Sequence, residues 1–165
     1  MTFPEPDATW RLNDGRDTET LGTSPHGTTR LVAPGSVTHG EFGLFEAVIP
    51  PGGPGAMPHF HTGFSESFYV VSGKLALMTG RDWRVAGSGD FVHVPPRGVH
   101  AFRAVDGAEP ARFLILFVPG APRERYFRGL AEFGRREVPP TPEEVDGFAR
   151  ECDQVNLRDW SSNPL

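Results

Sequence analysis

Glycine and proline divide this chain into short apolar runs, and that punctuation constrains the fold more than any other feature. The 165 residues include 20 Gly and 17 Pro. Between residues 29 and 118, nearly every apolar run is bounded by one of them or by an Asp/Gly pair. Short runs separated by turn formers are typical of an all-β sandwich or barrel. The expected strands are residues 29–33, 42–49, 66–71, 74–79, 83–86, 91–94, 100–105 and 112–118.

Length and charge narrow the class of protein. A chain of 165 residues supplies one sizeable core, and its 13 Phe and 3 Trp argue against disorder. A net charge of −5 disfavours a nucleic-acid or anionic-membrane surface. No run approaches the roughly 20 apolar residues of a membrane helix. The start of the chain lacks a signal-peptide pattern, and the lone Cys152 excludes an intramolecular disulfide. We therefore expect a cytoplasmic protein.

Three segments are expected along the chain. Residues 1–28 are polar with little periodicity, which indicates a surface arm or an irregular lead-in. Residues 29–118 form the barrel domain. Its last expected strand, residues 112–118, is apolar on both parities, so both of its faces should be covered. Residues 119–165 form a helical extension, and two helices packed outside the barrel would explain the doubly apolar last strand.

Two helices are predicted in that extension. The first carries a stripe at helical spacing and should end near Gly134. The second begins at Thr141-Pro142-Glu143-Glu144, which combines a capping box with proline at the first helical position. The two expected buried stripes are Tyr126, Phe127, Leu130 and Phe133, and then Val145, Phe148, Ala149 and Cys152.

The candidate site is a cluster of histidines with one glutamate. His59 and His61 are separated by one residue, so in a strand both side chains point to the same face. Glu66 begins the next expected strand, and His100 begins a later one. Three imidazoles and a carboxylate suit one divalent transition metal: iron, manganese, nickel, copper or zinc. Each residue also has an ordinary structural interpretation, because a lone strand histidine is more often a hydrogen-bonding partner than a ligand.

The spacing of these residues resembles the first conserved motif of the cupin superfamily without departure. The motif runs Gly53, five residues, His59-Phe60-His61, four residues, Glu66, six residues, Gly73.

The second cupin motif is matched with two departures. It opens at Gly89-Asp90-Phe91-Val92-His93-Val94-Pro95 and closes at His100, five residues after Pro95. Arg97 stands where the family has glycine, and Gly98 is expected to take over the turn. Ala104 replaces the terminal asparagine of the motif.

This resemblance implies a jelly-roll β-barrel and a homodimer, as in the quercetin dioxygenase-like cupins. It also implies that His59, His61, Glu66 and His100 hold one metal and leave one or two positions for water, oxygen or substrate. Glu66 is then the expected catalytic residue, as a ligand and as a proton acceptor.

Strand parity predicts what surrounds the metal. Phe68 and Val70 share the parity of Glu66, Phe102 shares that of His100, and Met57 shares that of His59. Two interpretations stay open. These side chains either line an apolar chamber for a flat or hydrophobic molecule, or simply fill a small barrel. His93 is a further pocket candidate as an acid or base, although a surface or core position is the more common role of such a histidine.

Three functions are compatible with these residues. The first is a metal-dependent dioxygenase acting on a small hydrophobic or aromatic enol-type substrate, by similarity to the quercetinase-like cupins. The second is a non-redox cyclase or isomerase in which the metal polarises a carbonyl and Glu66 or His93 moves a proton. The third is a non-catalytic barrel that binds a small ligand.

Overall fold

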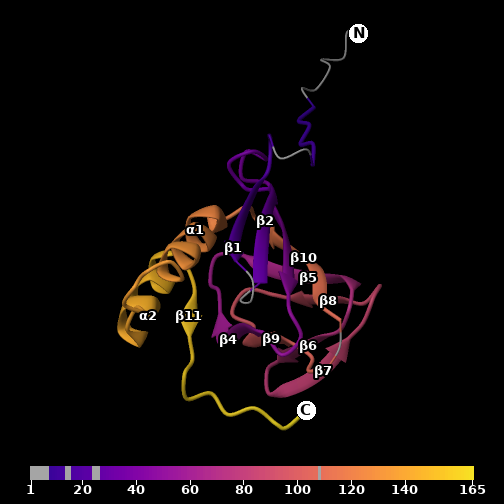
Figure 1. The fold of residues 1–165 in the computed structure, drawn as a ribbon, viewed down its shortest axis with the longest axis vertical. Helices are drawn as coiled ribbons and strands as arrows, with labels where there is room; N and C mark the ends of the chain where they lie inside the picture. Colours follow the sequence, from indigo (N-terminus) through magenta and orange to yellow (C-terminus); the bar gives the residue numbers. More distant parts are fainter. Residues whose placement is uncertain (1–7, 14–15, 24–26, 108) are drawn as a thin grey trace.

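The computed structural model describes residues 8–13, 16–23, 27–107 and 109–165. They form two antiparallel sheets with two helices at one side (Figure 1). The six-stranded sheet has the order β1-β2-β3-β10-β5-β8, and the five-stranded sheet has the order β11-β4-β9-β6-β7. The strands are β1 (Glu19–Thr23), β2 (Gly27–Ala33), β3 (Gly43–Ile49), β4 (Pro54–Phe60), β5 (Ser65–Ser72), β6 (Leu75–Thr79), β7 (Asp82–Ala86), β8 (Phe91–Val94), β9 (His100–Ala104), β10 (Ala111–Val118) and β11 (Val155–Asn156). The helices are α1 (Arg123–Phe133) and α2 (Pro142–Glu151). The predicted all-β class with two C-terminal helices is confirmed.

The core lies between the two sheets and is built by alternation along the strands. In β10, Phe113, Ile115 and Phe117 are buried. On β3, every second residue is buried, and Phe45 meets Phe117 edge-on with ring centroids 5.5 Å apart. Because successive side chains of a strand point to opposite faces, one parity of each strand faces the core. Five of the described phenylalanines, Phe45, Phe64, Phe68, Phe113 and Phe117, are buried and fill this interior.

The helices cover one end of this interior and leave the outer face of β10 uncovered. Phe127 of α1 packs against Phe45, with ring centroids 4.9 Å apart and the ring planes tilted by 45°, and also packs near Phe117. Both partners point inward, so α1 caps the core at the side where β1 lies. Leu114 and Leu116, on the opposite parity of β10, stay half-buried. The expectation that the helices cover the outer side of the last strand is therefore wrong.

The predicted irregular lead-in contains a strand. β1 pairs antiparallel with β2 at the edge of the six-stranded sheet, and its Leu21 is buried in the core. Among the four residues of β1 whose burial is described, Glu19 to Gly22, only Leu21 is buried, which gives too weak an alternation to be recognised in the sequence. β4 was also missing from the expected strands, since Pro54 and Pro58 interrupt it, and its pairing with β9 shifts register. Residues 1–7, which belong to the predicted arm, lie outside the described residues.

The start of α2 and the end of α1 fall at the predicted residues. The Thr141 hydroxyl accepts from the Glu144 amide at 3.2 Å, and the Glu144 carboxylate accepts from the Thr141 amide at 2.8 Å. This confirms the capping box at the start of α2. Gly134 ends α1 with φ −68°, a helical value, so a left-handed cap is not what ends this helix. Within the described residues, neither helix has the length and apolar content needed to span a bilayer.

Candidate metal centre

The structure brings His59, His61, Glu66 and His100 together between the two sheets. Their candidate ligand atoms all lie within 4.8 Å of one another, and each residue is at most 4% exposed. His59 on β4 is the cross-strand partner of His100 on β9, in the five-stranded sheet. His61 directly follows β4, and Glu66 comes from β5 of the facing sheet. The cluster thus bridges the barrel interior.

A backbone carbonyl fixes the orientation of each imidazole. The Nδ1 atoms of His59, His61 and His100 lie 2.7, 2.6 and 3.0 Å from the carbonyl oxygens of Met57, Asp153 and Gly98, respectively. A carbonyl oxygen only accepts, so each Nδ1 carries the hydrogen. Each Nε2 is thereby left to face the centre of the cluster. This outer arrangement is the one that orients histidines toward a metal.

The donor atoms facing one another fit a cation. The Nε2 atoms of His61 and His100 lie 2.9 and 2.8 Å from Glu66 Oε2, and that of His59 lies 4.0 Å from it. In neutral histidines with hydrogen on Nδ1, all these atoms are acceptors, so a proton or a metal ion must lie between them. Three nitrogens and a carboxylate oxygen match the preference of a borderline transition metal.

The pKa shifts describe how protons occupy the cluster without a metal. Burial raises the pKa of Glu66, but the hydrogen bonds with His100 and His61 outweigh burial and hold this pKa well below its usual value. Burial lowers the pKa of His100, and the hydrogen bond with Glu66 outweighs it, so the net pKa is raised. Burial lowers the pKa of His59 to about 3. The metal-free site therefore keeps Glu66 ionised, His59 neutral and His100 as the preferred carrier of a proton.

Two turns hold the ligand-bearing segments in place. Arg97 adopts a φ of 68°, in the left-handed region, and its amide donates to the His61 carbonyl at 2.6 Å. The sequence analysis expected Gly98 to take the turn conformation. The left-handed residue is instead Arg97. Gly98 is needed for another reason: a Cβ there would lie 2.7 Å from a methyl group of Val94.

The second turn comes from a residue that the sequence analysis missed. Asp153, just after α2, accepts hydrogen bonds through its carboxylate from the amides of Thr62 and Gly63, at 3.1 and 2.7 Å. Its own carbonyl accepts from His61. The C-terminal extension is therefore tied directly to the loop that carries a metal ligand. No local signal in the sequence connects Asp153 to that loop.

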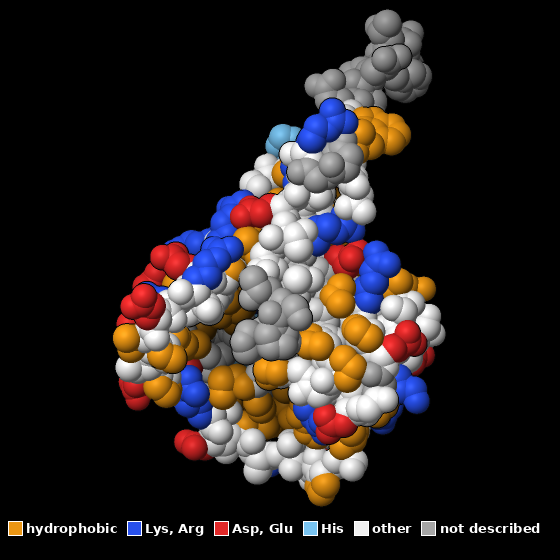
Figure 2. Space-filling model, viewed as in Figure 1, with side chains coloured by type: hydrophobic (Ala, Val, Ile, Leu, Met, Phe, Trp, Pro, Cys, Tyr) orange, Lys and Arg blue, Asp and Glu red, His pale blue; other side chains and the backbone are white. Residues whose placement is uncertain are grey.

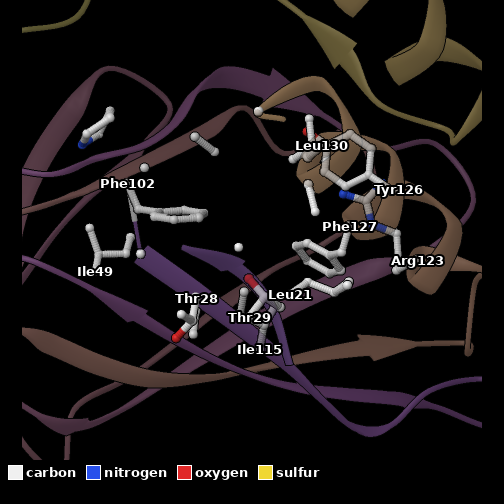
Figure 3. Close-up of a pocket in the computed structure, with 18 of the residues that line it drawn as sticks. Leu21, Thr28, Thr29, Ile49, Phe102, Ile115, Arg123, Tyr126, Phe127 and Leu130 are labelled. Carbon is white, nitrogen blue, oxygen red and sulfur yellow. The ribbon is translucent and has the colours of Figure 1, made fainter. Parts of the chain in front are cut away.

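A cavity of about 350 Å³ opens beside the cluster. Figure 2 shows hydrophobic side chains in the hollow between the helices and the sheets. Figure 3 shows that side chains from α1 line one side, with Phe102 and Ile49 across from them and Thr28 and Thr29 from β2 below. The lining residues include Leu21, Thr28, Thr29, Ala47, Ile49, Ala56, His59, Glu66, Phe102, Ile115, Arg123, Tyr126, Phe127, Leu130 and Gln154.

Of the five predicted pocket residues, Phe102 lines this cavity. Phe68 and Val70 point inward as predicted but lie in the packed core, where Phe68 contacts the rings of Phe102 and Phe113. Met57 is half-buried, and its carbonyl accepts from His59. His93 is exposed, on the outer face of β8, and its Nδ1 lies 2.9 Å from the Ser67 hydroxyl. Among the described residues, these last four are not part of the cavity wall.

Several polar residues of the cavity wall escaped the sequence analysis, and three of them, Arg123, Tyr126 and Gln154, contact one another. Arg123 is the first residue of α1, Tyr126 was assigned only to a packing stripe, and Gln154 follows α2. Arg123 is buried, and its guanidinium donates to the Cys152 carbonyl at 3.0 Å and to the Gln154 side chain at 2.9 Å. Arg123 lies three residues before Tyr126, so extending the helical stripe by one turn toward the N-terminus would have found it.

Comparison with known proteins agrees with this geometry. Residues 45–117 match the family model described as a cupin domain. The quercetin 2,3-dioxygenase of Bacillus subtilis (strain 168) is 27% identical over 130 residues, which make up 79% of this chain and 37% of that protein. The chain thus spans little more than a third of the length of this relative.

Solved structures resemble the fold at low sequence identity. KdgF from Halomonas sp. superposes with a TM-score of 0.57 at 20% identity, over 67% of this chain and 94% of its own. The polyketide cyclase RemF from Streptomyces resistomycificus gives 0.56 at 24% identity, over 67% and 80%. An RmlC-like cupin from Shewanella frigidimarina gives 0.55 at 20% identity, over 67% and 92%. At these identities the likeness establishes the fold.

Proposed function

The chain contains a cupin domain with the cupin fold, and we propose that it is a metal-dependent dioxygenase acting on a small hydrophobic or aromatic enol-type substrate. The observation that carries this proposal is the position of the ligand cluster on the cavity wall. His59 and Glu66 belong both to the cluster and to the lining of the 350 Å³ cavity. A ligand set that faces a cavity of this size leaves room for a small organic molecule beside the metal.

The chemistry of the cavity supports the same substrate class. Most of the wall is formed by apolar groups, among them the aliphatic and aromatic side chains of Ile49, Phe102 and Phe127. An apolar wall binds a flat or hydrophobic body and excludes water from the reacting end. The similarity to a quercetin 2,3-dioxygenase over 79% of this chain favours an oxygenase within this class. A barrel interior filled by side chains would instead have favoured a non-catalytic protein.

Glu66 has the position of a proton acceptor. One carboxylate oxygen, Oε2, is held by His61 and His100, while Oε1 makes no hydrogen bond with any described residue. The low pKa of Glu66 keeps the carboxylate ionised at neutral pH. A metal bound by the four residues would supply Lewis-acid activation of the enol oxygen and, if redox-active, electron transfer to dioxygen. Glu66 Oε1 then takes up the enol proton at the cavity wall.

The test is oxygen uptake by the protein loaded separately with iron, manganese, nickel, copper or zinc. The probes are quercetin and a phenyl-substituted 1,3-diketone, both of which carry an acidic enol or enol-like hydroxyl. We expect substrate-dependent oxygen consumption with at least one redox-active metal and none with zinc. In the Glu66→Gln variant, which keeps the side-chain shape, turnover should fall by about 10²-fold or more, because proton transfer contributes about that much.

Two other results would replace this proposal. Conversion of a probe at the same rate without air, with tightly held zinc, indicates a non-redox cyclase or isomerase. The exposed position of His93 leaves Glu66 to move the proton in that case. Metal and ligand binding without conversion of any probe by any metal form indicates a non-catalytic binding barrel.

Homodimerisation through the outer face of the six-stranded sheet belongs to the same proposal. Tyr69 and Phe91 are cross-strand neighbours there and are 44% and 62% exposed, and the half-buried Leu114 lies opposite Tyr69 on the other side. An exposed apolar patch on a sheet favours association. Sedimentation of the protein and of Phe91→Asp, which should shift a dimer toward monomer, tests this.

A cytoplasmic location is proposed on the buried, unpaired Cys152, and cell fractionation tests it.

A further inference from the structure

Arg123 presents a buried cation to the cavity with part of its donor capacity unused. The residue is 3% exposed and lines the cavity. Its two terminal nitrogens donate to Cys152 and Gln154, and its guanidinium lies 3.9 Å from the ring centroid of Tyr126. The third nitrogen, Nε, is buried and has no hydrogen-bond partner among the described residues. A buried donor without a partner is costly, so an acceptor from a ligand is favoured there.

The charges around the cavity point the same way. No carboxylate of a described residue lies within 4.0 Å of the Arg123 guanidinium. Glu66, the acidic residue of the cavity wall, is committed to the histidine cluster. With a divalent metal bound, the metal, Glu66 and Arg123 together carry two net positive charges inside the protein. Positive charge of this size in a buried site is costly unless an anion compensates for it.

Tyr126 offers a second donor at the same end of the cavity. Its hydroxyl accepts from the Gln154 side chain at 2.8 Å, and no described residue accepts the hydroxyl hydrogen. Figure 3 shows Arg123 and Tyr126 together on the α1 side, with Phe102 and Ile49 across the cavity. Arg123 and Tyr126 therefore lie on the opposite side of the cavity from Phe102 and Ile49.

We propose that Arg123 and Tyr126 bind an acidic oxygen group of the substrate, so that the substrate is an organic anion with an apolar body. The acidic group, a carboxylate separate from the enol that faces Glu66, lies at Arg123 Nε and the Tyr126 hydroxyl. The apolar body extends toward Phe102 and Ile49. This assignment rests on the proposed function in that it places a substrate in the same cavity. Beyond the proposed function, the assignment states that the substrate is negatively charged and that Arg123 and Tyr126 select it.

Binding of a charged probe and its neutral analogue tests the assignment. The probes are 2-naphthoate and 2-naphthamide, which share an apolar body and differ in charge, titrated by calorimetry into the protein with its metal content measured. We expect the wild type to bind 2-naphthoate at least tenfold more tightly than 2-naphthamide. In Arg123→Gln this preference should fall about tenfold at unchanged metal content. Arg125→Gln, which removes an exposed arginine of the same helix that pairs with Glu151, should keep it.

The remaining outcomes separate this inference from the proposed function. An unchanged preference in Arg123→Gln, or a wild type with no preference, overturns the assignment. If Arg123→Gln fails to give a cooperative thermal transition, Arg123→Lys and Tyr126→Phe replace it, and an unchanged preference in both overturns the assignment. An Arg123-dependent preference without oxygen uptake keeps the anion site and removes the dioxygenase. Oxygen uptake without an Arg123-dependent preference for the anion keeps the dioxygenase and removes the anion site.

Discussion

The motif-bearing strands and the segments that flank them contribute differently to the site. Residues 53–104 supply the four candidate metal ligands, and pairing between β4 and β9 places two of them opposite each other. The flanking segments, β1 and β2 on one side and α1 on the other, supply much of the cavity wall and the buried Arg123. The comparison suggests that metal binding is set by the local geometry of the strands, whereas substrate choice is set by segments that reach the cavity through tertiary packing.

This division is not complete, because Asp153 supports a ligand although it lies outside the motif-bearing strands, in the C-terminal flank just after α2. Its carboxylate holds the Thr62–Gly63 loop, and its carbonyl orients His61. A flank that both shapes the cavity and fixes a ligand couples substrate binding to the metal.

The largest expected effect is loss of the metal from the motif-bearing strands. His61→Ala and Glu66→Ala each remove a donor and leave the other buried groups without compensation. We expect bound metal to fall from near one per chain to less than a tenth, measured by elemental analysis of the purified proteins. His93→Ala is the matched control, because this histidine is exposed on the outer face of β8. Full metal content in both ligand variants would contradict the site.

A smaller effect is expected from Asp153→Ala in the flank. The backbone carbonyl that orients His61 remains, but the loop after His61 loses its hydrogen bonds to the carboxylate. Removal of such outer support typically lowers metal affinity by about 10–100-fold. Competition with a chelator measures this affinity. Asp146→Ala, which breaks the contacts of α2 with Arg158 and Asn156, is the control. Equal metal affinity in Asp153→Ala and Asp146→Ala would show that Asp153 does not support the metal site and that the site is confined to the motif-bearing strands.

Acidification should weaken metal binding through His100. A ligand must offer an unprotonated Nε2, and the pKa of His100 is raised above 6.5 by Glu66 in the metal-free protein. Below that pKa each binding event displaces a proton, so affinity falls by about tenfold for each pH unit. His59, with a pKa of about 3, does not compete above roughly pH 4. Calorimetry in buffers of different ionisation enthalpy counts the released proton. A pH-independent affinity between pH 5 and 7 would contradict this arrangement.

The same division separates what the sequence could and could not predict. The ligand set and, apart from β4, the strands between residues 29 and 118 follow from turn residues, strand parity and motif spacing, which are local. Parity also placed Phe68 correctly toward the interior. It could not decide between lining a cavity and filling the core, because Phe113 on another strand packs against that ring. Arg123 reaches the cavity because Phe127, on the same helix, packs against Phe45. That contact joins distant parts of the chain, so the helical stripe could place Arg123 on the buried face of α1 but could not place this face at the cavity.

The smallest expected effects test whether the helices can be altered without disturbing the metal. A Cβ at Gly129 of α1 would lie 2.2 Å from the ring of Phe148, whereas a Cβ at Gly147 of α2 would meet nothing within 4 Å. Gly147→Ala should therefore stabilise the protein by up to about 1 kcal/mol, the difference in helix propensity. Gly129→Ala gains the same propensity but displaces the Phe148 ring from its contacts with Tyr126 and Phe133, and overpacking costs about 1–3 kcal/mol.

Denaturant unfolding of the two alanine variants measures this difference, and elemental analysis of the same samples shows whether it reaches the metal. If Gly129→Ala loses stability at full metal content, packing between α1 and α2 is independent of the ligand set. If it also loses metal, the displacement is transmitted along α2 to Asp153, and the coupling between flank and ligand extends over the whole helix pair. Because Gly147 lies on the same helix as the residues leading to Asp153, an unchanged metal content in Gly147→Ala is required for the second conclusion.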